Sequence, residues 1–105
     1  MRQYDIHVVN LDPTRGSEIR ETRPCVILTP DEMNAHLNTV QVAPLTSNPK
    51  PYPWRVPIVH RRKAGRVALD QIRTIDKARL VRRAGRVEAH AIADIKRVIH
   101  EMLVQ

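Results

Sequence analysis

The stretch from Leu11 to Pro24 holds side chains suited to acid–base and phosphate chemistry. It has the sequence LDPTRGSEIRETRP and combines carboxylates with three arginines, with almost no apolar side chains. A carboxylate that is ionised at neutral pH can accept a proton, and a guanidinium can hold two oxygens of a phosphate group. Because Asp12, Pro13 and Gly16 favour turns, the stretch is predicted to be an exposed loop between two strands.

The positive charge of the chain is concentrated in one segment. The net charge is +7, and between His60 and Arg86 there are ten Lys or Arg residues against Asp70 and Asp76. A solvated, arginine-rich surface would explain such a run. The imbalance fits a polyanionic partner at least as well, so both interpretations stay open at this point.

Four separated motifs resemble the MazF/PemK family of bacterial toxins, the mRNA interferases. They are LDPTRGSE (11–18), TRPCVIL (22–28), PLTS (44–47) and VALDQIRTID (67–76), which stand in the family's order. Four motifs at fitting intervals arise by chance far less often than one. The resemblance implies a mainly β (α+β) fold, a small SH3-like β-barrel with a C-terminal α-helix, and a homodimer.

The resemblance also implies a function. The chain would be the toxin of a type II toxin–antitoxin system, an endoribonuclease that cleaves single-stranded mRNA and is held inactive by a cognate antitoxin protein. Attack by the 2′-OH would leave a 2′,3′-cyclic phosphate and a 5′-hydroxyl. Neither a metal nor another cofactor is expected, since the five histidines and the one cysteine show no metal-ligand spacing.

Cleavage of this kind needs a base for the 2′-OH, fixed positive charge on the phosphate and a proton donor for the leaving 5′-oxygen. The resemblance places Glu18, Arg23 and Thr46 at the active groove, from segments that the fold must bring together. Glu18 is the first choice as base, Arg23 fits electrostatic stabilisation rather than proton donation, and Thr46 would hold a phosphate oxygen. The residues assigned to RNA binding are Arg15, Ser17, Arg20, Ser47, Tyr52, Arg61, Arg62, Lys63, Arg66, Gln71 and Arg73.

Asp70 is a second carboxylate candidate for catalysis, because members of the PemK branch use an aspartate in the block that matches VALDQ. The chain departs from that branch at Ser17 and Ala68, where the pattern has a histidine and an arginine. Asp70 would equally well be structural, paired with neighbouring Arg66 or Arg73. The choice of base between the two carboxylates stays open.

Short apolar and β-branched runs bounded by turn residues predict strands at 5–11, 25–29, 39–45, 54–59 and 66–72. Pro57 cannot donate to a strand ladder, so the fourth strand is expected at an edge or at a bulge. A turn or single helical turn is expected at 30–36. A C-terminal helix is predicted from apolar residues at helical spacing: Ile92, Ile95, Ile99 and Met102.

Four single residues carry further expectations. Tyr52 and Trp54 flank a proline-rich loop and either stack on one or two bases or pack, with Trp54 in the core. Cys25 lies in an apolar run and is expected to be buried. Tyr4 stands where the family commonly has a glycine, and only a local change at the entry to the first strand is expected.

The chain of 105 residues is expected to form a single domain over residues 1–105. The first residues lack the pattern of a signal peptide, and no apolar stretch approaches the length of a membrane span, so a cytoplasmic location without a membrane partner is expected. A rival function is a non-catalytic toxin on the same fold, similar to the CcdB-type gyrase poisons, which would inhibit a protein target and cleave no RNA.

Overall fold

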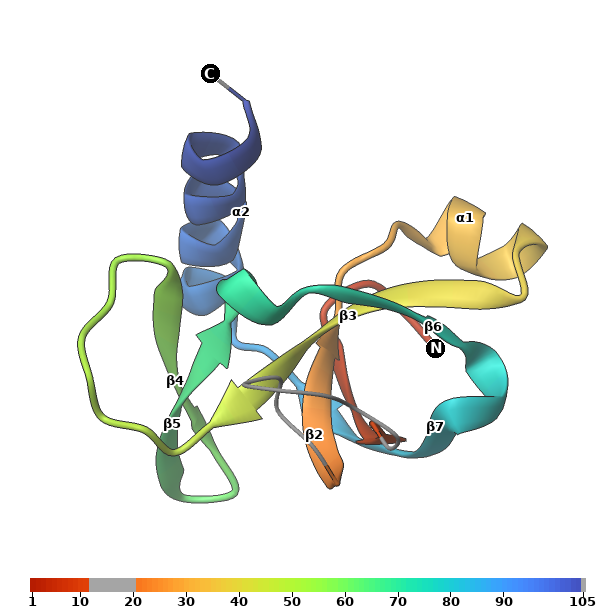
Figure 1. Cartoon of the computed structure of the whole chain (residues 1–105), viewed down its shortest axis with the longest axis horizontal. Coiled ribbons are helices and arrows are strands. Elements are labelled where there is room, and N and C mark those ends of the chain that lie inside the picture. The colour runs from red at the N-terminus through yellow and green to blue at the C-terminus, as the bar shows by residue number, and fades with distance from the viewer. Residues whose placement is uncertain (12–20, 105) are drawn as a thin grey trace.

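A strongly curled antiparallel sheet dominates the computed structural model, which describes residues 1–11 and 21–104 (Figure 1). Within these residues two α-helices accompany the sheet, α1 (Asp31–His36) and α2 (Ala89–Leu103), and 3-10 turns lie at 69–71 and 77–79. The strands are β1 (Asp5–Asn10), β2 (Thr22–Ile27), β3 (Thr39–Thr46), β4 (Arg55–His60), β5 (Lys63–Ala68), β6 (Arg73–Asp76) and β7 (Leu80–Arg86).

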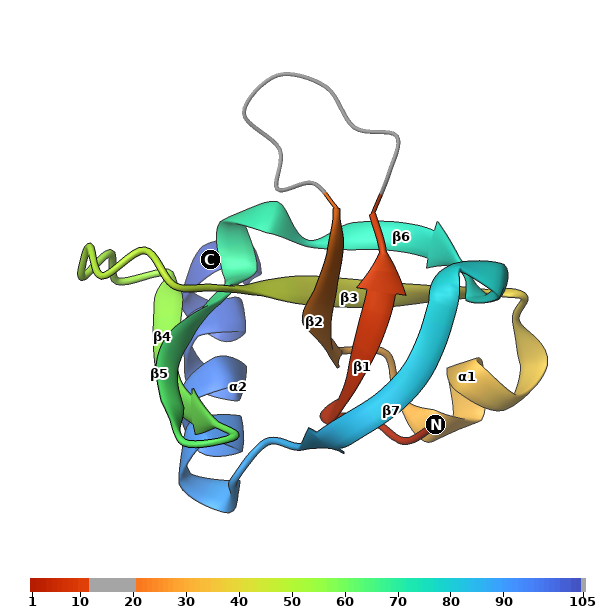
Figure 2. The same ribbon diagram turned by 90° about the horizontal axis from the view of Figure 1, so that it is seen from below.

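The long strand β3 joins the β4–β5 hairpin to the rest of the sheet. The strand order is β4-β5-β3-β2-β1-β7, and β6 also pairs with β3. One edge of β3 pairs with β2 at residues 42–44, and the other edge pairs first with β6 at 39–42 and then with β5 at 45–46. The β4–β5 hairpin and α2 therefore lie at one end of the molecule, while α1 and the junction of β6 with β7 lie at the other (Figures 1 and 2).

Both faces of the central strands are buried. Val26 of β2 belongs to a core cluster that includes Ile95 of α2, whereas its neighbours Cys25 and Ile27 point to the opposite face and join Val9 in a second cluster. This alternation follows from the period of two residues in a strand. Cys25 is fully buried, as its apolar surroundings predicted.

The predicted mainly β fold with a C-terminal helix is confirmed, and so are four of the five predicted strands to within three residues at each end. Pro57 is exposed on β4, which ends the strand order, so the predicted edge position is also confirmed. In α2, the predicted stripe faces the core with Ile95 fully buried at its centre. None of the described helices is long and apolar enough to cross a membrane.

The predicted strand at 66–72 is confirmed only over residues 66–68 and is wrong beyond them. The strand β5 ends at Ala68, and a 3-10 turn separates it from β6. The residues from Val67 to Leu69 are all buried, and the Leu69 N–H donates to the carbonyl of Trp54 at 3.2 Å, so the backbone turns inward here. Strand β7 was not predicted, because its arginines hide any apolar alternation. Arg23 was expected in the loop but belongs to β2.

Tyr4, which stands where the family commonly has a glycine, affects more than the entry to β1. Tyr4 has φ of +69°, in the region that a glycine adopts without strain. Its side chain is only 9 % exposed and belongs to the core cluster beside α2, and Lys96 Nζ lies 5.9 Å from its ring centroid. The burial of the ring thus offsets a strained backbone.

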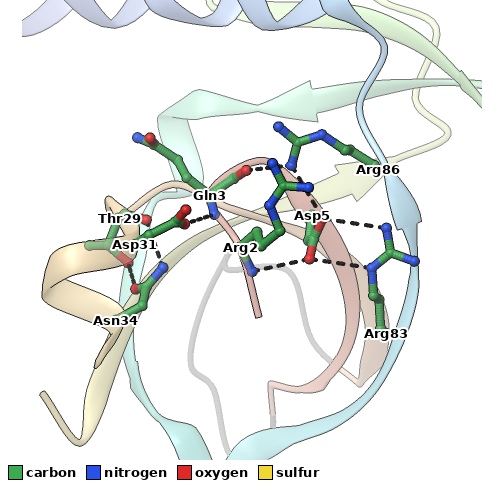
Figure 3. Close-up of polar contacts among 8 residues, drawn as sticks. All are labelled: Arg2, Gln3, Asp5, Thr29, Asp31, Asn34, Arg83 and Arg86. Atoms are coloured by element: carbon green, nitrogen blue, oxygen red, sulfur yellow. Dashed lines mark hydrogen bonds and ion pairs between the residues drawn. The ribbon is translucent and has the colours of Figure 1, made fainter. Parts of the chain in front are cut away.

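A buried carboxylate ties the N-terminus to β7 (Figure 3). Asp5 is 2 % exposed and accepts hydrogen bonds from the Arg2 backbone N–H at 3.0 Å and, through ion pairs at 3.3 Å each, from Arg83 and Arg86. Burial alone would raise the pKa of Asp5, but the contacts with Arg83, Arg2 and Arg86 outweigh burial and lower it. Two arginines of the basic segment therefore have a structural partner.

Candidate active site

Strands β2 and β3 bring Arg23 and Thr46 together. The paired register of the two strands ends at Cys25 and Pro44, and Arg23 and Thr46 each lie two residues beyond that pair in the same direction. Both residues line one pocket of about 240 Å³. Arg23 is half-buried and its Nη1 donates to the carbonyl of Leu45 at 3.4 Å, so the guanidinium is held at the pocket wall.

The hydroxyl of Thr46 is oriented by the loop that follows it. It accepts a hydrogen bond from the backbone N–H of Asn48 at 3.2 Å. An accepted bond leaves the hydroxyl hydrogen available to a ligand oxygen. Ser47, the next residue, is exposed and lines both this pocket and a larger one of about 500 Å³, which Arg66 and residues of the first turns of α2 also line.

The tip of the β4–β5 hairpin supplies basic side chains beside the pocket. His60 pairs with Lys63 across a two-residue turn, and the turn residues Arg61 and Arg62 have φ of +51° and +65°. Hairpin turns of this kind prefer Asn-Gly, because positive φ strains residues with a Cβ. Arg61, Arg62 and Lys63 are exposed, and Arg61 Nη2 donates to the carbonyl of Ala84 on β7 at 3.3 Å. Lys63 also lines the pocket.

His60 was missed as a candidate in the sequence, although it lines the pocket with Arg23 and Thr46. Burial first and the charge of Arg61 second lower the pKa of His60 below its ordinary value. The available signal was weak: a titratable residue at the end of a predicted strand, followed by three basic residues.

Asp70 lies outside the lining of this pocket and is engaged elsewhere. Arg55 Nε and Nη2 donate to its two carboxylate oxygens, both at 3.0 Å. Burial would raise the pKa of Asp70, but the hydrogen bonds and charge of Arg55 lower it overall. The expected structural pair is thus present with a different partner, since Arg66 and Arg73 were expected. Arg73 Nη1 instead donates to the carbonyl of Leu11 at 3.2 Å.

Tyr52, Trp54 and Arg55 form a stack beside that ion pair. The rings of Tyr52 and Trp54 lie 5.2 Å apart and 9° from parallel, and the Arg55 guanidinium carbon lies 5.4 Å from the Tyr52 centroid. Trp54 is 40 % exposed, so its expected alternative place in the core is wrong. Gln71 lies next to the pair, with its Nε2 3.5 Å from an Asp70 oxygen.

Four of the predicted site residues, Arg15, Ser17, Glu18 and Arg20, lie outside the described residues. The described ends of that segment are adjacent, because the Leu11 N–H donates to the carbonyl of Glu21 at 3.1 Å. Within residues 1–11 and 21–104, no group of three His, Cys, Asp or Glu side chains is placed to hold a metal ion.

Comparison with known proteins identifies relatives along nearly the whole chain. Residues 2–103 match the family model described as the PemK-like, MazF-like toxin of type II toxin–antitoxin system. The chain is 37 % identical to the endoribonuclease MazF9 of Mycobacterium tuberculosis over 106 aligned positions, which cover 90 % of this chain and 89 % of that protein.

Solved structures agree with this match. MazF from Deinococcus radiodurans superposes with a TM-score of 0.87 at 25 % identity and covers 100 % of this chain and 97 % of its own. The Mycobacterium tuberculosis toxin MazF-mt6 gives a TM-score of 0.78 at 27 % identity, with 92 % and 93 % covered. The chain therefore belongs to the family of PemK-like, MazF-like toxins of type II toxin–antitoxin systems.

Proposed function

We propose that this chain is a toxin that acts as a metal-independent, sequence-selective endoribonuclease on single-stranded mRNA. The observation that carries the proposal is the shared pocket of Arg23 and Thr46 in a chain of this family. A fixed guanidinium beside a hydroxyl donor suits a phosphodiester that gains negative charge as it reacts. The relative from Mycobacterium tuberculosis, named an endoribonuclease, supports the same activity.

In the proposed reaction the 2′-oxygen attacks phosphorus and the 5′-oxygen leaves, which gives a 2′,3′-cyclic phosphate and a 5′-hydroxyl. Arg23 stabilises the charge on the pentacoordinate phosphate, and Thr46 donates its hydroxyl to a phosphate oxygen. Glu18 is proposed as the base for the 2′-OH. Two observations favour it over Asp70: Asp70 lies outside the pocket lining, and Arg55 engages both oxygens of that carboxylate.

The wider RNA-binding surface is proposed to extend from the hairpin tip to the aromatic stack. Phosphates would meet Arg61, Arg62 and Lys63, and a base would stack on the exposed face of Trp54 beside Tyr52. The other residues proposed to contact RNA are Arg15, Ser17, Arg20, Ser47, Arg66, Gln71 and Arg73.

The basic hairpin tip gives a test of this surface. Replacing Arg61 with Asn, Arg62 with Gly and Lys63 with Ala is expected to weaken RNA binding across sequences and to reduce the salt slope by about 0.7 for each phosphate that is no longer neutralised. Asn-Gly suits the positive φ of the turn, so the hairpin should persist. Affinity is measured by fluorescence anisotropy over a salt series, with the double variant Lys96→Ala, Arg97→Ala on the exposed side of α2 as control.

Equal affinity and equal salt slope in the turn variant and the wild type would show that the hairpin tip is only a solvated surface. A changed cleavage sequence would also contradict the proposal, because contacts to phosphates carry no base information.

The remaining proposals concern the setting of the protein. We propose that the chain acts in the cytoplasm as a homodimer with one domain over residues 1–105. A cognate antitoxin protein holds it inactive, as the family's description implies. Since the pocket and hairpin tip are basic, an acidic antitoxin segment is expected to compete with RNA for them.

The proposed activity is tested with purified protein, a long RNA and EDTA. Discrete fragments with 5′-hydroxyl ends are expected, because no step uses a metal. Intact RNA would overturn the proposal and favour a toxin that inhibits a protein target. Sequencing of the 5′-hydroxyl ends from a mixed transcript pool would then define the cleaved sequence.

A further inference from the structure

The proposed reaction leaves one role unfilled. As the bond between phosphorus and the 5′-oxygen breaks, that oxygen needs a proton. Arg23 holds its proton too tightly to donate it, and a threonine hydroxyl such as that of Thr46 is a much weaker acid than an imidazolium. Glu18 would already serve as base. The leaving oxygen therefore calls for another titratable group at the pocket.

His60 is placed to fill this role. It is the last residue of β4 and lines the pocket of about 240 Å³ together with Arg23 and Thr46. Its imidazole packs against β7 at Gly85, where an added Cβ would lie 3.3 Å from Cε1 and 3.6 Å from Nδ1. Glycine at position 85 leaves room for the ring, and Nε2 is the ring nitrogen farther from this contact.

We propose that His60 is the general acid of the reaction, an inference that rests on the proposed function. The 2′-oxygen forms its new bond to phosphorus and gives its proton to Glu18. The bond from phosphorus to the 5′-oxygen breaks, and the protonated ring of His60 gives its Nε2 proton to that oxygen. Exchange of protons with water then restores both residues for the next turnover.

The charges around His60 explain when it carries the proton. The charge of Arg61 in the turn acts on His60. Arg23 of β2 and Lys63 of β5 line the same pocket, while β7 presents Gly85, which has no side chain. In the empty site, burial and Arg61 lower the pKa of His60, so the ring is largely neutral at pH 7. A bound phosphodiester adds negative charge and favours the imidazolium. Binding of the substrate thus favours the protonated form of His60, which is the form that can act as the acid.

This coupling predicts two different pH profiles. The ratio kcat/KM reports the free enzyme and should fall as the pH rises through the lowered pKa of His60. The value of kcat reports the complex, so its decline should lie at higher pH. A residue that only supports the fold would not produce this separation.

The decisive experiment compares two versions of one short RNA that contains the mapped cleavage site. They differ only in the atom that bridges phosphorus and the 5′-carbon at that site, which is either oxygen or sulfur. Sulfur leaves as a thiolate and needs little help from an acid. His60→Gln is expected to slow cleavage of the oxygen substrate by about 10²- to 10⁴-fold and to abolish the decline at high pH. The sulfur substrate should be cleaved at nearly the wild-type rate.

The matched control is His90→Gln. His90 is exposed on α2 and lines the neighbouring pocket, not the one with Arg23. This variant should cleave both substrates like the wild type. Circular dichroism and thermal unfolding check that each variant is folded.

Equal slowing of both substrates in His60→Gln, or an unchanged decline at high pH, would overturn the role of His60 as acid. The wild type supplies a second test that needs no variant, because its decline at high pH must be present with the oxygen substrate and absent with the sulfur one. If the wild type cuts neither RNA, the proposed function itself fails, which is a different result from a folded variant that cuts without the predicted selectivity.

Discussion

Arg23→Ala is expected to lower the rate of RNA cleavage at least about a hundredfold, while the protein stays folded. Arg23 is half-buried, lines the pocket together with Thr46 and donates to the Leu45 carbonyl, so its guanidinium is fixed before the substrate arrives. A donor that is already in place stabilises developing charge without reorganisation, and loss of one such donor costs about 3 kcal/mol. The rate is measured under single-turnover conditions, so that slow product release does not hide the effect.

The stability of the Arg23 variant should change little. The hydrogen bond from Arg23 to the Leu45 carbonyl is long, at 3.4 Å, and such a bond contributes about 1 kcal/mol at most. Arg23→Lys should lie between the wild type and Ala, because it keeps the charge but loses the planar grip on two oxygens. Arg97→Ala, on the exposed side of α2, is the control. Near-normal cleavage by folded Arg23→Ala would remove this residue from the mechanism.

Asp5→Ala is expected to destabilise the protein by about 2 to 3 kcal/mol. It leaves the Arg2 N–H and the guanidiniums of Arg83 and Arg86 without their shared acceptor. The loss should be smaller than for a fully buried pair, because the side chains of Arg83 and Arg86 are 56 % and 36 % exposed and regain water. Urea unfolding at neutral pH measures the difference.

The pH dependence gives a second signature of Asp5. Its folded-state pKa is lowered, so its contribution is complete above the unfolded-state pKa and is lost as the pH falls through the folded-state value. The stability difference between the wild type and Asp5→Asn should therefore stay constant down to about pH 5 and shrink as the pH falls from there towards about pH 2. Asp94→Ala on α2, where the carboxylate lies 3.8 Å from Arg97 Nη2, should cost less than about 1 kcal/mol. A constant difference across this pH range would contradict the assignment.

The sequence predicted those parts of the fold whose side chains alternate cleanly. The stripe centred on Ile95 and the edge position of Pro57 follow from periodicity and from the missing N–H of proline. Strand β7 escaped prediction because two of its charged residues, Arg83 and Arg86, bind Asp5 at the far end of the chain. No local pattern reveals a partner that distant.

The site was predicted only where motifs mark it. Arg23 and Thr46 stand in family motifs, and they line one pocket where the paired part of β2 and β3 ends. His60 stands in no motif, and its place at the pocket depends on how the β4–β5 hairpin meets β7. The partner of Asp70 was predicted among its neighbours in sequence, but Arg55 reaches it from the adjacent strand β4.

The burial of Cys25 gives the chain a built-in reporter of its own opening. It is the only cysteine, it is fully buried, and its strand β2 lies between β1 and β3. Burial raises the pKa of its thiol to about 12. Near neutral pH the closed protein therefore neither exposes the thiol to a reagent nor holds it as the reactive thiolate. Reaction with a thiol reagent then requires these strands to separate. The labelling rate, relative to that of the unfolded chain, measures how often the centre of the sheet opens, without an engineered probe.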